Sequence, residues 1–208
     1  MSATGRNLEG NERRELDFYE TEGWVTRSIL EAVDVSGSVL DAGCGTGAIL
    51  REVIKRNAQK ISVARGVELD PVRAAKAKET ATPNVWCGDF LTMGPAETPW
   101  DVVIANPPYA LAQEFVDHAR VLGTLVIFLL RLNFLGSAAK FAKYMPDVYV
   151  LPKRPSFTGD GRTDATEYAW FVWGRDRGTW GADRNPIEPN VGRLQVLRIP
   201  EDAERKTP

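Results

Sequence analysis

The chain has 208 residues, of which 43% are hydrophobic and 26% charged, so it can fold around a sizeable core. Its formal net charge of -2 argues against a protein that coats nucleic acid without specificity. The longest apolar run, 125–130, is far shorter than the roughly 20 residues that span a bilayer. One histidine and two cysteines argue against a metal site or a disulfide framework, so we expect a cytoplasmic protein without bound metal.

The predicted elements alternate between helix and strand along the chain. Residues 1–12 are expected to be a flexible N-terminus, and an amphipathic helix is predicted within 17–33. Five apolar runs follow, each suited to a strand buried on both faces: 38–43, 61–69, 84–90, 101–106 and 124–130. Helical segments, such as 47–56 and 71–79, lie between them. This alternation predicts a parallel sheet with crossover helices, whose ligands bind beyond the carboxyl ends of the strands.

The last two strands are predicted at 147–151 and 167–173. We therefore expect one domain at 13–174, with a long loop at 151–167 between these strands. Residues 175–208, rich in glycine, proline and charge at their start, are expected to form a C-terminal loop or extension.

Acidic residues follow three successive strands beside a glycine-rich loop. The first strand runs into "DAGCGTG", with Asp41 and with glycines at 43, 45 and 47. Glycines allow the backbone to turn tightly against a ligand. Glu68 ends the second strand, where it could accept bonds from two ribose hydroxyls, and Asp89 ends the third, where it could bind an adenine amino group. Each acid alone could simply cap the next helix, and the loop also fits a dinucleotide pattern, but together they indicate an adenosine site.

These motifs resemble the class I S-adenosylmethionine-dependent methyltransferases over about residues 17–174. The resemblance implies a Rossmann-like fold with a seven-stranded, mostly parallel sheet, an antiparallel last strand and helices on both faces. It also implies that Asp41 faces the methionine ammonium group, directly or through a water. The cofactor-binding residues implied are Phe18, Tyr19, Thr21, Asp41, Gly43, Cys44, Gly45, Gly47, Glu68, Leu69, Asp89, Phe90 and Asn106.

The fourth strand ends in "NPPY", residues 106–109. The Asn106 side-chain oxygen and the Pro107 carbonyl could accept bonds from the two N–H groups of a planar amine. Such acceptors would stabilise the positive charge that develops during methyl transfer. Pro107 and Pro108 stiffen the turn, and the Tyr109 ring could stack on the amine's plane. We therefore take Asn106, Pro107, Pro108 and Tyr109 as the catalytic group.

The tetrapeptide is similar to the [D/N/S]PP[Y/F] motif of amino-methyltransferases, which act on adenine, cytosine or a protein glutamine amide. The segment with Phe18, Tyr19 and Thr21 resembles an N-terminal motif of DNA adenine methyltransferases, although Glu22 replaces its usual proline. Residues 131–175 resemble compact phage and prophage adenine methyltransferases. These resemblances imply a prokaryotic or phage-encoded enzyme that methylates adenine N6 in DNA.

The loop at 151–167 is the expected substrate contact. Lys153, Arg154 and Arg162 could neutralise phosphates, and Phe157 could pack on an unstacked base. A glutamine methyltransferase, an RNA adenine methyltransferase and an inactive binding or activator subunit remain alternatives. Cys44 and Cys87 are expected to be small fillers, and His118 is expected to be an ordinary helix residue.

Overall fold

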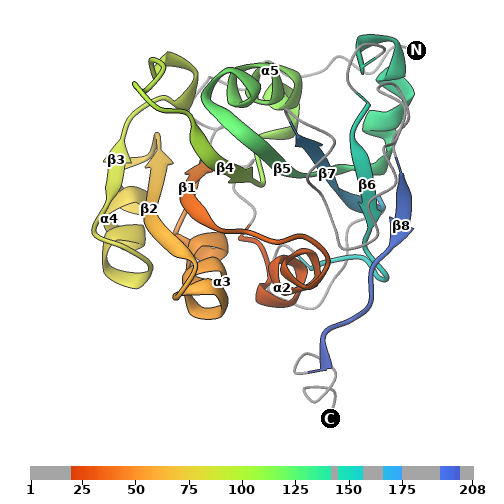
Figure 1. Ribbon diagram of the computed structural model, residues 1–208, viewed down its shortest axis with the longest axis horizontal. Helices are drawn as coiled ribbons and strands as arrows, with labels where there is room; N and C mark the ends of the chain where they lie inside the picture. The colour runs from red at the N-terminus through yellow and green to blue at the C-terminus, as the bar shows by residue number, and fades with distance from the viewer. Residues whose placement is uncertain (1–19, 142–144, 157–165, 175–192, 202–208) are drawn as a thin grey trace, which may run out of the picture.

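The computed structural model describes residues 20–141, 145–156, 166–174 and 193–201, and only the backbone of 137–141. These residues form one eight-stranded sheet in the order β3-β2-β1-β4-β5-β7-β6-β8 (Figure 1). The strands are β1 (Gly37–Ala42), β2 (Ile61–Glu68), β3 (Val85–Cys87), β4 (Trp100–Ala105), β5 (Gly123–Arg131), β6 (Asp147–Val150), β7 (Tyr168–Gly174) and β8 (Leu194–Val196). Only β7 pairs antiparallel, with β5 on one side and β6 on the other.

The central strands are buried on both faces because alternate side chains enter two separate cores. In β5, for example, Val126, Phe128 and Leu130 pack on one side, while Ile127 and Leu129 pack on the other. This division explains why β5 is apolar from residue 125 to residue 130, as the sequence analysis predicts.

Helices cover both faces. Along one face lie α2 (Gly23–Ala32), α3 (Ala48–Asn57) and α4 (Pro71–Thr80), with α5 (Ala112–Leu122) on the other (Figure 1). Short 3₁₀ segments complete the fold at η1 (Phe90–Thr92), η2 (Tyr109–Leu111) and η3 (Leu132–Phe141). No helix in the described ranges has both the length and the apolar character needed to cross a membrane.

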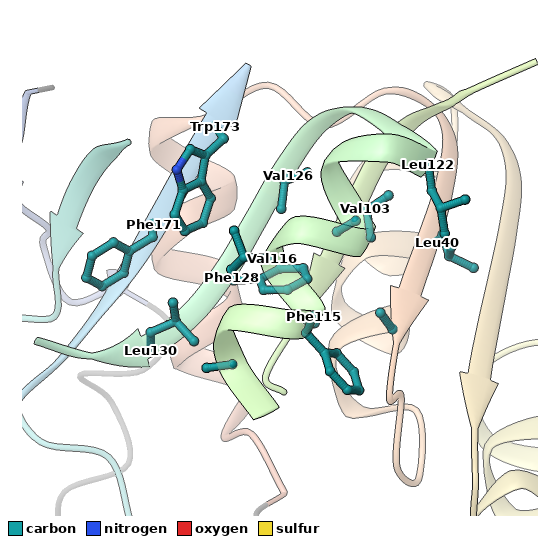
Figure 2. Close-up of a cluster of buried hydrophobic side chains, with 14 of the residues drawn as sticks. Leu40, Val103, Phe115, Val116, Leu122, Val126, Phe128, Leu130, Phe171 and Trp173 are labelled. Carbon is teal, nitrogen blue, oxygen red and sulfur yellow. The ribbon is translucent and has the colours of Figure 1, made fainter. Parts of the chain in front are cut away.

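The core beneath α5 is shown in Figure 2. Phe115 and Val116 of α5 point toward the sheet, where Val103, Val126 and Phe128 of neighbouring strands meet them. All five side chains are buried. Apolar packing of this kind fixes α5 directly after the turn that ends β4, and therefore helps to fix that turn.

Two expectations about strand arrangement need correction. The sheet has eight strands rather than seven, because residues 194–196 pair in parallel with β6. The region predicted as a C-terminal loop or extension thus contains a strand, followed by the buried Leu197. The expected flexible segment 1–12 and the start of the predicted domain at 13–19 lie outside the described residues. So do residues 175–192 and 202–208 of the predicted C-terminal loop or extension.

Candidate active site

The predicted site residues gather where β1, β2, β3 and β4 end, because the four strands run parallel and adjacent. The loop after β1 turns on Gly43, Gly45 and Gly47, which have φ angles of 77°, 54° and 84°. These angles lie in the left-handed region, which glycine adopts without strain. The backbone N–H groups of Gly43 and Cys44 both donate to the Val67 carbonyl at 2.8 Å, so the loop is tied to β2.

Arg51 fixes the far side of the same loop. Its guanidinium donates to the Thr46 carbonyl at 2.9 Å and to Glu20 Oε1 at 3.0 Å. The Thr46 hydroxyl also donates to Glu20, at 3.0 Å. Glu20 therefore joins the chain just before α2 to the glycine loop.

Asp41 is fully buried beneath this loop. Neither of its carboxylate oxygens has a hydrogen-bond partner of ordinary geometry among the described residues. Burial raises the pKa of Asp41 well above its ordinary value, and the nearby Glu68 carboxylate raises this pKa further, although the Leu50 backbone N–H opposes the shift. The carboxylate is thus a buried acceptor whose charge the protein alone does not neutralise.

Glu68 is buried at the end of β2, and internal donors surround it. Its Oε2 accepts from the Gly45 N–H at 2.8 Å. Its Oε1 accepts from the Asp70 N–H at 2.9 Å and from Arg73 Nε and Nη2 at 3.1 and 3.0 Å. Both oxygens therefore already brace the loop and α4, so a ribose would have to share them. The sequence analysis did not predict Arg73.

Asp89 lies at the end of the next strand and caps η1, with its Oδ1 accepting from the Leu91 N–H at 2.9 Å. The Phe90 ring beside it is buried, 4.9 Å from the Phe115 ring and 5.0 Å from the His118 ring. His118 Nε2 lies 3.0 Å from the Met93 carbonyl, as befits a packing residue. Leu69 is 45% exposed at the same edge, where an apolar ligand surface could cover it.

Asn106 follows β4, the neighbour of β1, so the turn at 106–109 starts beside the glycine loop. Its Nδ2 donates to Thr21 Oγ1 at 3.1 Å, and its Oδ1 accepts from the Tyr109 hydroxyl at 3.0 Å. The Pro108 carbonyl accepts a hydrogen bond from the Leu111 N–H at 2.9 Å. It is therefore occupied within the turn, and the Pro107 carbonyl is the one predicted to accept a bond from the amine. The turn is therefore held by hydrogen bonds as well as by its prolines.

The Tyr109 ring has protein neighbours. Arg131 Cζ, at the end of β5, lies 4.9 Å from its centroid, and the Tyr168 ring lies 5.6 Å away. The sequence analysis predicts this ring as a stacking surface, and a base would have to share it with the Arg131 guanidinium. Arg131 was missed as a site residue, although it is the charged residue that ends the most apolar run in the sequence.

The predicted substrate loop is described only at its ends. Lys153 Nζ lies 5.0 Å from the centroid of the Trp24 ring, and Arg154 pairs with Glu167 at 2.6 Å. Both cations are exposed. Phe157, Arg162, Phe18 and Tyr19 lie outside the described residues. No cluster of three or more His, Cys, Asp or Glu side chains suited to a metal occurs in the described ranges.

Comparison with known proteins finds a match to one family model and several similar proteins. Residues 25–125 match the family described as methyltransferase small domain. A tRNA1(Val) (adenine(37)-N6)-methyltransferase of Haemophilus influenzae is 34% identical over 80 residues, which cover 35% of this chain and 34% of that protein. A ribosomal protein L11 methyltransferase of Aliivibrio salmonicida is 31% identical over 107 residues, covering 47% of this chain and 35% of that protein. The chain thus spans about a third of the length of these relatives.

Among solved structures, the 23S rRNA methyltransferase ErmE is similar with a TM-score of 0.56 and 19% identity. The match covers 76% of this chain and 69% of that one. At this identity the likeness concerns the fold alone.

Proposed function

We propose that this chain is a class I S-adenosylmethionine-dependent methyltransferase that methylates the exocyclic N6 of adenine in RNA; its match to the methyltransferase small domain over residues 25–125 and its fold support this. The observation that carries the proposal is the position of Asn106, at the end of β4 directly beside the glycine loop that follows β1. The adenine N6 activity of the tRNA-modifying relatives favours RNA over the DNA substrate that the sequence resemblances imply.

The residues present fit this cofactor. Among the described residues, neither oxygen of the buried Asp41 carboxylate has a hydrogen-bond partner of ordinary geometry, and an ammonium group such as that of methionine would supply a donor. Gly43 leaves room beside the loop, because a Cβ there would meet nothing nearer than Phe115 Cε1 at 3.6 Å. Asp89, Leu69 and the edge of Glu68 would complete an adenosine site. When bound, S-adenosylmethionine supplies a methyl group on a sulfonium that leaves as a neutral thioether.

The protein's part in the reaction is to hold the amine. Asn106 Oδ1 has two lone pairs, so it can accept an amine N–H while it keeps its bond from the Tyr109 hydroxyl. The Pro107 carbonyl is the second acceptor. As the N–C bond forms, positive charge grows on the amine nitrogen, and these two oxygens stabilise it. The nitrogen then loses one proton to water, so no strong base is needed in the site.

The test supplies labelled S-adenosylmethionine with unmodified tRNA transcripts, duplex DNA, single-stranded DNA and a ribosomal protein. We expect label in RNA, recovered as N6-methyladenosine after digestion. If label appeared only in DNA or only in protein, the proposal of an RNA substrate would be wrong, and the labelled molecule would be the substrate.

Variants at Asn106 test the amine site itself. Asn106→Ala should lower kcat at least about 100-fold, the usual scale for one lost electrostatic contact in a transition state. Cofactor affinity, measured by calorimetry, should stay within about twofold. Asn106→Asp keeps the acceptor and should retain more activity than the alanine variant. Full turnover by Asn106→Ala would show that the amine binds elsewhere.

A further inference from the structure

The residues just before α2 touch both the amine site and the start of the loop after β6. Thr21 accepts the bond from Asn106 Nδ2, at 3.1 Å. Its neighbour Glu22 uses one oxygen, Oε2, for two bonds: from the backbone N–H of Ser156 at 2.8 Å and from the Trp24 indole N–H at 3.0 Å. Two consecutive residues therefore connect Asn106 to Ser156.

The segment 151–156 emerges at the edge of the sheet where the amine site lies. Strand β6 runs in the same direction as β4 and β5, because β7 pairs antiparallel with both β5 and β6. Its carboxyl end, and thus Leu151, lies at the same edge as Asn106. The contact between the rings of Tyr109 and Tyr168, at 5.6 Å, agrees with this, since β7 begins at that edge.

The same segment carries positive charge that remains accessible. Lys153 lies over the Trp24 ring at 5.0 Å from its centroid, so Trp24 contacts both Glu22 and Lys153. Arg154 pairs with Glu167, but both side chains are about half exposed, and such surface pairs are weak. A phosphate could therefore displace Glu167.

We propose that Glu22 is a positioning residue for the nucleic acid: by binding the Ser156 N–H and the Trp24 indole, it holds residues 151–156 and their two cations beside the amine site. The inference rests on the proposed function, because it takes RNA as the substrate. Glu22 replaces the proline usual in the resembling N-terminal motif, and a proline could accept neither bond with its side chain.

The matched variants are Glu22→Ala and Glu22→Gln. Because a single oxygen accepts both bonds, the glutamine carbonyl can replace it, whereas alanine cannot. Glu97→Ala, at an exposed position, controls for the loss of one negative charge. The first readout needs no substrate: in ¹H–¹⁵N spectra the Ser156 amide and the Trp24 indole resonances should move together in Glu22→Ala, and the Ser156 amide should exchange faster. Both should stay near their native positions in Glu22→Gln.

The second readout is the Kd of a fluorescein-labelled, adenine-containing RNA, measured by anisotropy. We expect Glu22→Ala to weaken RNA binding about tenfold, the effect of losing bonds to one charged group. Cofactor Kd should be unchanged, and Glu22→Gln and Glu97→Ala should bind RNA as the native protein does.

The role given to Glu22 would be wrong if Glu22→Ala bound RNA as tightly as the native protein. It would also be wrong if the alanine and glutamine variants lost RNA affinity and cofactor affinity to the same extent. The proposed function fails in a different way, through a native protein that binds the RNA and transfers no methyl group to it.

Discussion

The buried position of Asp41 does not contribute to the stability of the fold. A buried carboxylate that lacks a hydrogen-bond partner of ordinary geometry among the described residues destabilises the fold when it is charged. A positively charged group bound beneath the glycine loop, as proposed above, would supply that partner. Glu68 differs, because four N–H groups already stabilise its charge.

Replacing Asp41 by asparagine should stabilise the cofactor-free protein at neutral pH. The pKa of Asp41 is raised in the folded state, so its contribution to stability is fully present below the ordinary pKa of 3.8 and is lost as pH rises through the raised value. Asparagine does not titrate. The Tm of Asp41→Asn should therefore exceed that of the native protein by about 3 °C near pH 7.5, equivalent to roughly 1 kcal/mol.

The same comparison at acid pH provides the control. The difference in Tm should shrink as the pH falls toward 4, where Asp41 is protonated in the native protein. Cofactor Kd, measured by calorimetry at pH 7.5, should rise about tenfold in the variant because a charged contact is lost. A lower Tm for Asp41→Asn at neutral pH would show that the carboxylate has a stabilising partner.

At the scale of elements, Gly47 controls the junction of β1 and α3. Its φ of 84° lies in the left-handed region, and a Cβ there would lie 2.7 Å from Ala81 Cβ, just after α4. Gly47→Ala should thus lower the free energy of unfolding by about 3 kcal/mol, through backbone strain and overpacking. Urea denaturation measures this loss. The matched control is Gly94→Ala, since a Cβ at 94 would have open space around it; an equal loss there would contradict the argument.

Elements with a strong pattern could be predicted from sequence. Helix α4 begins and ends within one residue of its prediction, because Asp70 caps it and Pro71 starts it. Strands β4 and β5 were found because nearly all of their residues are apolar and buried. Strand β2 was expected to be buried on both faces too, but Ser62, Val63 and Arg65 in its first half are exposed. Contacts between distant elements could not be predicted, because no local pattern encodes them. The bond from Asn106 to Thr21, 85 positions apart, is an example. The bond from Arg73 to Glu68 spans only five positions, but it depends on side-chain geometry, and it decides which Glu68 oxygen is already in use.

At the scale of the whole molecule, the Rossmann-like sheet and its cofactor edge follow from the alternation of strands and helices. The eighth strand does not, because its three exposed residues, "LQV", alternate over too short a stretch to predict a strand. They form a strand only because β6 presents an edge for them to pair with. The choice among RNA, DNA and protein also lies beyond the sequence motif, since "NPPY" predicts a planar amine as the methyl acceptor and not what carries that amine.

The distribution of the two thiols over the fold has a practical consequence. Cys44 is a buried residue of the glycine loop, and burial raises its pKa well above the ordinary value, so it stays a protonated, unreactive thiol. Cys87, expected from the sequence to be a small filler, is instead exposed, and in the sheet it pairs with Glu68, at the end of the site where we propose that adenosine binds. A maleimide dye should therefore attach once per native molecule, as mass spectrometry can verify. The fluorescence of the protein labelled at Cys87 would then change when cofactor binds, without any engineered mutation.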